Sequence, residues 1–288
     1  MVSELRPRHG PSQAVRRRRT ILIASAGAAA LVIAAGVGVA FAVAGKGNDV
    51  AMTVPSASSS RSATPTPSST PTRTPTPTPT PSGDGFDKTA HSIDDPSSIW
   101  LVVDKLRPLN PANYAPDVVQ VPVPYINEPY LRPVVSDAVV AMFAAFNAET
   151  GLQMQSQSAY RSYDTQVRVY QGWVDSLGQA GADATSARPG FSEHQTGLAI
   201  DINALPDQGC ALEPCWADTP HAQWLLANSW KYGFIVRYQV GETPITGYES
   251  EPYHMRYVGV ELATEMHKTG VKTLEEFFGL PAAPDYAQ

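Results

Sequence analysis

Two short segments of the chain carry histidine and carboxylate side chains at spacings that could hold a metal ion. His194 and Asp201 stand seven residues apart, and Gly197 between them permits a turn that brings both side chains to one point. Further along the chain, Glu251 and His254 stand three residues apart. Two neutral imidazoles, one carboxylate and an open water position form a catalytic zinc set, and a second carboxylate beside the water can act as general base. Spacing alone leaves open the ordinary alternative, in which these are unconnected core or surface residues.

These side chains must be positioned by elements that the apolar periodicity of the chain predicts. A short strand over 197–202 would carry Asp201, and a strand over 253–258 would carry His254. The other predicted elements are strands over 99–104, 153–160 and 234–238, and helices over 134–150, 162–177, 221–232 and 260–269. Strands and helices do not alternate regularly, and the sequence has no glycine-rich nucleotide-binding loop. This order predicts an α+β fold with a small, mostly antiparallel sheet flanked by helices.

The charge distribution excludes one class of partner. Residues 85–288 carry 24 acidic against 12 basic side chains, a net charge of −12. Nucleic-acid binding needs a cationic face, so we expect no nucleic-acid partner for this region. At roughly 200 residues, the segment is long enough to bury a sizeable core and is the predicted catalytic domain.

The residues before this domain predict an exported, membrane-anchored protein. Residues 1–20 hold six arginines and one acid, which favours a cytoplasmic tail. Residues 21–45 contain no charged side chain and, at about 1.5 Å per residue, are long enough for a helix that crosses a bilayer. Residues 46–84, rich in proline, serine and threonine, predict a disordered extracellular stalk. Cleavage of a secretory signal after Ala44 is the alternative, and it would leave the domain secreted.

Cys210 and Cys215 are the only cysteines of the chain. Disulfides persist in exported domains, so we expect this pair to close a local disulfide loop, with two free thiols as the alternative. Zinc ligation by the pair is disfavoured, because the C-x4-C spacing is loose and no second cysteine pair completes a thiolate site.

Four blocks of the sequence resemble the VanY-type zinc D-alanyl-D-alanine carboxypeptidases, a family with the D,D-peptidase/hedgehog-like fold. Residues 187–201 resemble the zinc-binding motif of the family, and residues 245–259 resemble its second metal motif. The segment 158–162 resembles its substrate-binding Tyr-Arg-Ser segment, and 101–116 resembles the usual beginning of the domain. The blocks follow the expected order and span 99–278, which is nearly the whole predicted domain.

The resemblance implies a metallopeptidase with zinc in a surface groove. His194, Asp201 and His254 would bind one zinc ion per domain, and Glu251 would be the catalytic base that activates the zinc-bound water. Arg161 would face the substrate and hold either its carboxylate or the developing oxyanion. The further substrate contacts that the resemblance implies are Tyr160, Ser192 and Gln166.

The activity that the resemblance implies is removal of the C-terminal D-alanine from peptidoglycan stem peptides outside the cytoplasm. A D,D-dipeptidase, an L,D-carboxypeptidase and a cross-link endopeptidase remain open on the same metal site, because loops around the scissile bond decide between them. Tyr253 stands where the family usually has tryptophan, and its added hydroxyl bears on substrate fit. A non-hydrolytic wall-binding module is the alternative from another class, and the presence of all four metal and base residues argues against it. The sequence indicates no protein partner.

Other polar residues near these motifs have plainer interpretations. Glu193 is expected to be a solvated or hydrogen-bonded loop acid, with a supporting position around the metal as the alternative. His221 is expected to lie at the surface near the start of its helix. For Arg237 and Arg256, substrate positioning and structural ion pairing are equally open.

Overall fold

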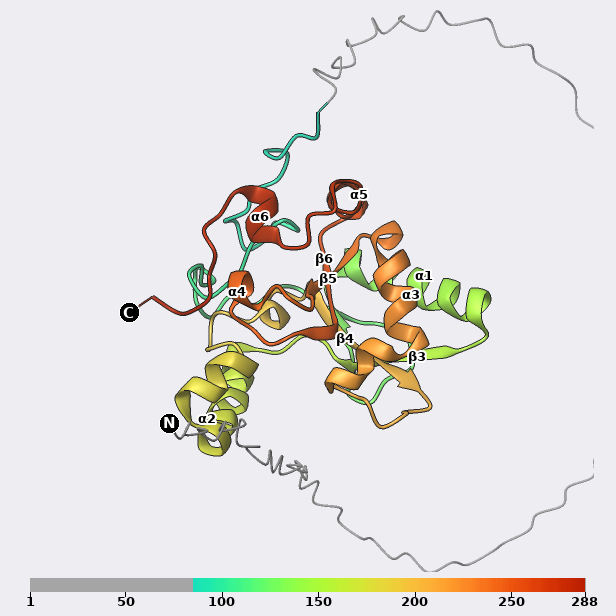
Figure 1. Ribbon diagram of the computed structural model, residues 1–288, viewed down its shortest axis with the longest axis horizontal. Coiled ribbons are helices and arrows are strands. Elements are labelled where there is room, and N and C mark those ends of the chain that lie inside the picture. Colours follow the sequence, from blue (N-terminus) through green and yellow to red (C-terminus); the bar gives the residue numbers. More distant parts are fainter. Residues whose placement is uncertain (1–84, 288) are drawn as a thin grey trace, which may run out of the picture. The chain divides into compact units, whose positions relative to one another are not determined.

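An antiparallel sheet forms the centre of the computed structural model, which describes residues 85–287 (Figure 1). The spatial order of its strands is β3 (Gln153–Ser158), β4 (Ala199–Leu205), β6 (Glu251–Tyr257) and β5 (Phe234–Tyr238). Every neighbouring pair in this order is antiparallel. A separate antiparallel pair is formed by β1 (Val119–Gln120) and β2 (Tyr130–Leu131). The predicted α+β class with a small antiparallel sheet is confirmed.

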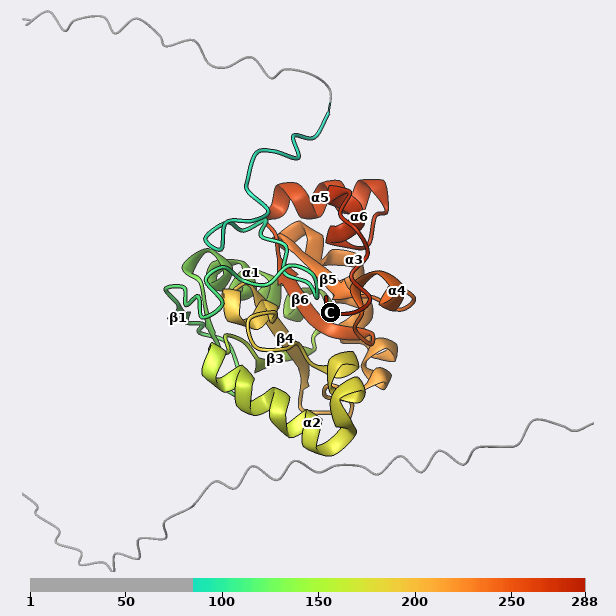
Figure 2. The same ribbon diagram turned by 90° about the vertical axis from the view of Figure 1, so that its left-hand side faces the viewer.

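Helices flank the sheet, as the sequence predicts. They are α1 (Pro133–Thr150), α2 (Tyr163–Thr185), α3 (Pro220–Asn228), α4 (Thr243–Thr246), α5 (Val260–Thr269) and α6 (Leu274–Phe278). Short 3₁₀ turns are η1 (Glu193–Thr196), η2 (Pro214–Asp218) and η3 (Ser229–Tyr232). In both views α2 lies at one end of the domain and α5 and α6 lie at the other, with the sheet between them (Figures 1 and 2).

Side-chain alternation along β4 separates the core from the face that carries the candidate ligands. Ile200, Ile202 and Ala204 are fully buried in the main hydrophobic cluster, which they share with residues of α1 and α3. Each buried isoleucine contributes about 1.5–3 kcal/mol to folding. Asp201 points to the opposite face, because successive residues of a strand alternate. Packing of the apolar residues therefore fixes the direction of the carboxylate.

The segment predicted as a strand over 99–104 begins in a turn and is buried from Trp100 onward, but it joins neither sheet. It carries one isolated bridge, between Asp104 and Arg107. The Arg256 guanidinium takes the place of a neighbouring strand, because its Nη2 donates to the carbonyl oxygens of Leu101 at 2.7 Å and of Ile99 at 3.2 Å. The strand prediction is wrong for this reason: a side chain, not a β ladder, satisfies these backbone groups.

Two predicted helices have different limits in the structure. The helix expected over 162–177 continues to Thr185, across a kink where Gly178 has φ 73° and ψ 172°. The helix expected over 221–232 divides into α3 and η3. Its predicted end at Gly233 is confirmed: the residue has φ 84°, and a Cβ there would lie 2.8 Å from the Tyr257 ring. Glycine is required at this turn by both conformation and space.

The predicted cytoplasmic tail, transmembrane anchor and stalk fall within 1–84, outside the described residues. Among residues 85–287, no helix has the length and apolar character needed to cross a bilayer. The membrane-spanning segment over 21–45 and the domain boundaries before residue 85 therefore stay predictions.

Candidate metal centre and active site

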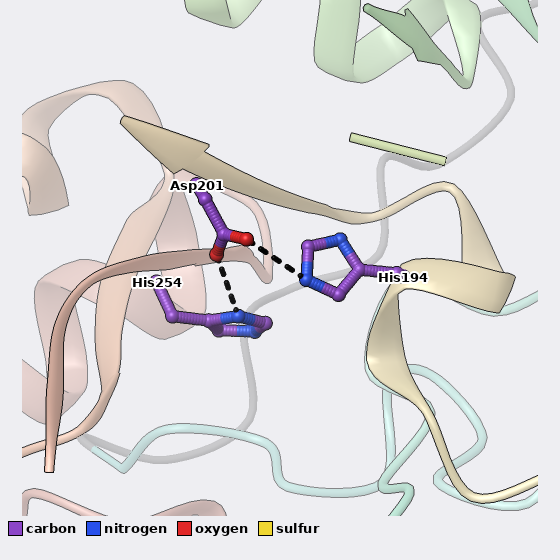
Figure 3. A group of neighbouring side chains, drawn as sticks. All are labelled: His194, Asp201 and His254. Atoms are coloured by element: carbon purple, nitrogen blue, oxygen red, sulfur yellow. Dashed lines mark hydrogen bonds and ion pairs between the residues drawn. The ribbon is translucent and has the colours of Figure 1, made fainter. Parts of the chain in front are cut away.

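Two histidines and an aspartate from three different elements meet on the sheet face opposite α1 and α3. His194 lies in η1, Asp201 in β4 and His254 in β6, and their side chains point toward one another (Figure 3). His194 Nε2 lies 3.3 Å from Asp201 Oδ2, and His254 Nδ1 lies 3.1 Å from Asp201 Oδ1. One potential ligand atom from each residue lies within 4.8 Å of the other two. The structure thus brings the three predicted metal ligands together, and all three are buried.

Sheet register and one tight turn produce this arrangement. Asp201 and His254 are direct partners across the β4–β6 pair. His194 is held in place by the turn that ends η1 at Gly197, where φ is 66°. A Cβ at Gly197 would lie 3.1 Å from the Arg132 side chain. Glycine therefore satisfies a left-handed backbone and a close approach at the same position.

Hydrogen bonds orient each imidazole so that one ring nitrogen is left for a metal. His194 Nδ1 lies 2.7 Å from the Ala159 carbonyl oxygen, which can only accept, so Nδ1 carries the proton and Nε2 faces Asp201. His254 is turned the other way: Nε2 lies 3.1 Å from Glu193 Oε2, and Nδ1 faces Asp201. Two oriented imidazoles and a carboxylate that converge in a buried position fit a zinc ion with an open coordination position.

The electrostatics of the three ligands favour a cation between them. Burial alone would raise the pKa of Asp201, but the two imidazoles hold it well below its usual range. Burial lowers the pKa of His194 and so favours a neutral ring. Burial opposes the charge on His254 as well, yet hydrogen bonds to Asp201 and Glu193 raise its pKa to about 10. The carboxylates of Asp201 and Glu193 therefore stabilise a positive charge on His254, next to the position that a metal ion would take.

Glu251 lies beside the ligand set at the start of β6. Its Oε2 is 3.6 Å from His254 Nδ1, and its side chain is 19% exposed. Burial raises the pKa of Glu251 to about 8, with His254 opposing the shift and Asp201 adding to it. A bound cation would favour the ionised carboxylate. This position, next to the candidate ligands and partly exposed to solvent, suits a general base.

Arg161 is anchored beside the same centre. Its backbone N–H donates to the His194 carbonyl oxygen at 3.2 Å. Its guanidinium donates to Gln166 Oε1 at 2.9 Å and to Ser158 Oγ at 3.2 Å. The positive charge acts on both His194 and Glu251, where it favours the neutral imidazole and the ionised carboxylate. Arg161 thus lies next to the candidate ligands, and its contact with substrate stays a prediction.

The other predicted substrate contacts lie at different depths. Gln166 is fully buried, and its Nε2 donates to the Ala187 carbonyl oxygen at 2.6 Å while its Oε1 accepts from Arg161. The Gln166 amide therefore fixes the Arg161 guanidinium through a hydrogen bond, and direct contact between Gln166 and substrate stays a prediction. Ser192 is buried at the start of η1, and Tyr160 is half-buried next to Arg161. Their contacts with substrate also stay predictions.

Arg237 and Arg256 form structural ion pairs, one of the two alternatives that the sequence left open, and their shared partner is Glu193. Glu193 is 2% exposed, and its carboxylate contacts Arg237 and Arg256 as well as His254. Burial alone would raise the pKa of Glu193, but the two guanidinium groups hold it well below its usual range. Of the expected solvated or hydrogen-bonded loop acid, only the hydrogen bonding is confirmed, because Glu193 is buried. Its contact with His254 agrees with the alternative of a supporting position around the candidate metal ligands. Two buried arginines in apolar strands were the signal that an acid must lie between them.

His221 is likewise not a surface residue. It is 1% exposed, with Nε2 3.1 Å from the Gln153 carbonyl oxygen and the ring packed beside Phe146. It shares the apolar side of α3 with Trp224 and Leu225, at the i, i+3, i+4 spacing of a buried stripe. That spacing is the sequence signal that places it in the core, far from any metal role.

The predicted disulfide between Cys210 and Cys215 is present. It closes the loop before η2, and η2 contacts β6, the strand that carries Tyr253 and His254. Tyr253 is half-buried there, and burial together with the Glu251 charge raises the pKa of its phenol. The effect of Tyr253 on substrate fit stays a prediction.

Comparison with known proteins agrees with this site. The family model of VanY, D-alanyl-D-alanine carboxypeptidase, matches residues 128–260, a range that contains all three ligands, Glu251 and Arg161. YodJ of Bacillus subtilis (strain 168), which is named as a carboxypeptidase, is 38% identical over 193 residues, covering 65% of this chain and 69% of YodJ.

Solved structures extend the likeness to the fold. The LdcB LD-carboxypeptidase is 39% identical with a TM-score of 0.59, over 64% of this chain and 87% of LdcB. A variant of the D,D-pentapeptidase VanY from a VanB-type vancomycin-resistance cassette, solved in complex with Zn(II), is 33% identical with a TM-score of 0.52, over 63% of this chain and 98% of that one. This chain therefore belongs to the VanY family of D-alanyl-D-alanine carboxypeptidases, which are zinc peptidases, and its buried His194, Asp201 and His254 form the candidate metal site.

Proposed function

We propose that the protein is an extracytoplasmic, zinc-dependent carboxypeptidase that removes the C-terminal D-alanine from peptidoglycan stem peptides. The observation that carries the proposal is the convergence of His194, Asp201 and His254 beside Glu251, in a chain of the VanY family. Arg161 adds a fixed positive charge at the same place. The proximity of these five side chains supports their proposed roles as metal ligands, general base and substrate-binding cation.

The ligand residues would hold a single zinc ion. When bound, zinc supplies Lewis-acid activation of water and stabilisation of negative charge on the scissile carbonyl oxygen. His194 would offer Nε2 and His254 would offer Nδ1, because the other nitrogen of each ring is hydrogen-bonded to Ala159 or Glu193. Asp201 offers one oxygen to each side.

Glu251 would act as the base and then as the acid. Its carboxylate takes a proton from the attacking water as oxygen bonds to the carbonyl carbon of the penultimate residue. It then delivers the proton to the nitrogen of the departing D-alanine as the C–N bond breaks. The products are the shortened peptide and free D-alanine, and proton balance is closed by exchange with solvent at the 19% exposed side chain.

Arg161 would bind the terminal carboxylate of the substrate, with stabilisation of the developing oxyanion as the alternative. A planar guanidinium matches a carboxylate through paired N–H donors. Gln166 and Ser158 already hold the guanidinium in place, so little ordering is needed when the substrate arrives. Recognition of a free C-terminus would restrict cleavage to the last residue.

A second candidate activity is that of an L,D-carboxypeptidase acting on tetrapeptides. The likeness to the LdcB LD-carboxypeptidase favours it. A D,D-dipeptidase and a cross-link endopeptidase use the same chemistry with different space beyond the scissile bond. A wall-binding module without hydrolysis is disfavoured, because it would need neither Glu251 nor Arg161.

The proposal includes a location outside the cytoplasmic membrane. The cationic residues of 1–20 and the uncharged residues 21–45 support an anchor with a cytoplasmic N-terminus. The Cys210–Cys215 disulfide supports an oxidising compartment for the domain. Release by signal cleavage after Ala44 remains the alternative, and the mass of the N-terminal peptide from the mature protein distinguishes the two.

A panel of stem peptides tests the proposed activity. The full-length protein in mild detergent is incubated, with zinc or with a chelator, with a pentapeptide ending in D-Ala-D-Ala, a tetrapeptide ending in one D-alanine and a cross-linked dimer. Zinc-dependent loss of one alanine from the pentapeptide is the expected result. Cleavage of the tetrapeptide alone favours the L,D activity, release of a dipeptide favours the dipeptidase, and opening of the dimer favours the endopeptidase. No cleavage by zinc-loaded protein contradicts the proposal.

A further inference from the structure

A buried chain of charged groups connects His254 to the C-terminal helix α6. Glu193 Oε2 lies 3.1 Å from His254 Nε2, and Glu193 Oε1 accepts from Arg256 Nη1 at 2.7 Å and from Arg237 Nε at 3.0 Å. Arg237 continues to Glu275 of α6 through two hydrogen bonds of 3.0 and 2.6 Å. The two glutamates and the two arginines of this network are each at most 2% exposed. The two oxygens of Glu193 therefore have separate partners, the arginines on one and the imidazole on the other.

Ion pairing by itself does not account for this network. Burying four charged groups carries a large desolvation cost before pairing, and apolar residues of similar volume are often as stabilising as such a network. Arg256 also anchors the 99–101 segment through the carbonyl oxygens of Ile99 and Leu101. Glu193 is thus held from two sides by groups that are themselves fixed. Pairing with the two arginines leaves one feature unexplained, which is the second oxygen of Glu193, directed at His254.

We propose that Glu193 is a positioning residue that decides which ring nitrogen of His254 binds the metal. A carboxylate only accepts hydrogen bonds, so the Nε2 that faces Glu193 carries a hydrogen. Nδ1 faces Asp201 at 3.1 Å, and the hydrogen on this nitrogen is the one that a metal shared with Asp201 would displace, which leaves the lone pair of the ring on Nδ1. Arg237 and Arg256 keep the carboxylate from rotating away, because both donate to its other oxygen. The inference rests on the proposed zinc site.

The two histidine ligands are oriented by different means. The acceptor that orients His194 is the backbone carbonyl of Ala159, which no side-chain substitution removes. The acceptor that orients His254 is a side chain. His254 is therefore the ligand whose tautomer a point substitution can reverse.

Glu193→Gln is the substitution that reverses it. The amide oxygen is expected toward Arg237 and Arg256, because both guanidinium groups donate at that position. The amide NH₂ then faces His254 Nε2, which must accept, and the ring proton moves to Nδ1, the nitrogen that zinc needs. We expect zinc affinity to fall by about 10- to 100-fold, the usual range for loss of a partner that orients a ligand.

Glu275→Gln is the matched control for a purely structural role. It neutralises a buried carboxylate of the same network, but its contact is Arg237 and not the imidazole. Both substitutions are expected to lower the melting temperature. Only Glu193→Gln is expected to change the protonated nitrogen of His254.

The test uses full-length protein labelled with ¹⁵N-histidine, with His254 assigned from a His254→Ala spectrum. Long-range ¹⁵N–¹H spectra report which ring nitrogen carries a proton, and competition with a chelator gives the zinc Kd. We expect Nε2–H in zinc-loaded wild type, and Nδ1–H with a weakened Kd in Glu193→Gln. The inference is overturned by an unchanged tautomer and Kd in that variant. If Glu193→Gln does not fold, the spectrum of zinc-loaded wild type is the test. Zinc bound through Nε2 of His254 would overturn the inference. Wild type that binds no zinc overturns the proposed function as well.

Discussion

Asp201 and His254 are direct neighbours across β4 and β6, and Asp201 Oδ1 lies 3.1 Å from His254 Nδ1. Two of the three candidate ligands are therefore placed by sheet register alone. A slip of one residue would turn one of these side chains to the opposite face of the sheet, among the apolar residues that pack on α1 and α3. The same packing that stabilises the sheet thus protects the geometry of the metal centre.

Replacing Asp201 by asparagine tests this pair. The change keeps the size of the side chain but removes the carboxylate that lies between the two imidazoles. We expect the variant to lose stoichiometric zinc while keeping its fold, as measured by metal analysis and circular dichroism. Asp175→Asn, at an exposed position of α2, is the control that should keep zinc. Full zinc content in Asp201→Asn would remove Asp201 from the ligand set.

Arg161 and Gln166 give a graded prediction for substrate binding. Arg161→Lys keeps the charge but loses the guanidinium that Gln166 and Ser158 hold. We expect kcat/KM to fall by about 10- to 100-fold, in line with ~1.5–3 kcal/mol for a hydrogen bond to a charged group. Gln166→Ala should have a smaller effect in the same direction, because the amide acts through Arg161. Steady-state kinetics with unchanged zinc content check this, and unaltered kcat/KM in both variants would show that neither residue serves the substrate.

Zinc binding is expected to release protons and to weaken as the pH falls. Burial opposes the charge on His254, but hydrogen bonds to Asp201 and Glu193 raise its pKa to about 10 without metal. The ring is therefore protonated at neutral pH, and Nδ1 must lose its proton to bind zinc. Below pH 10, each lower pH unit should raise the apparent Kd by up to about tenfold from this group. Calorimetric titration in buffers of different ionisation enthalpy counts the protons, and a count of zero contradicts the prediction.

The Cys210–Cys215 disulfide should contribute modestly to stability. It closes a loop with a sequence separation of five residues, for which loop-closure entropy gives about 2 kcal/mol. Replacing both cysteines by serine is expected to lower the free energy of unfolding by that amount in urea titrations at equal zinc. The oxidised and reduced wild type should differ in the same way. Equal unfolding midpoints in all of these samples would mean that the loop is already ordered without the bond.

Local patterns predicted most of the sheet and helices because those elements bury one regular face. The β4 residues Ile200 and Ile202 alternate with Asp201, and this period set the direction of the carboxylate correctly. The strand prediction over 99–104 was wrong because apolar, buried residues do not reveal which groups form hydrogen bonds with their backbone carbonyls. Its partner is the Arg256 guanidinium, more than 150 residues away in the sequence.

In the candidate site, too, residues in short sequence motifs could be predicted, and a residue positioned by distant partners could not. His194, Asp201, His254 and Glu251 belong to short motifs, so a family resemblance could point to all four. The position of Glu193 depends on partners 44 and 63 residues away, Arg237 and Arg256, and no local period reports such contacts. Sequence-based reasoning therefore pointed to the residues that would touch metal, and gave a supporting position for Glu193 only as the less favoured alternative.

The most direct test of the central claim is to measure zinc content and turnover together in Glu251→Ala. The residue lies beside the ligands, with Oε2 3.6 Å from His254 Nδ1, but is assigned to proton transfer and not to metal binding. We predict zinc content equal to wild type and a loss of about 10²- to 10⁴-fold in kcat on a peptide ending in D-Ala-D-Ala, the range typical of a general base. Wild-type turnover in the zinc-loaded variant would contradict the account.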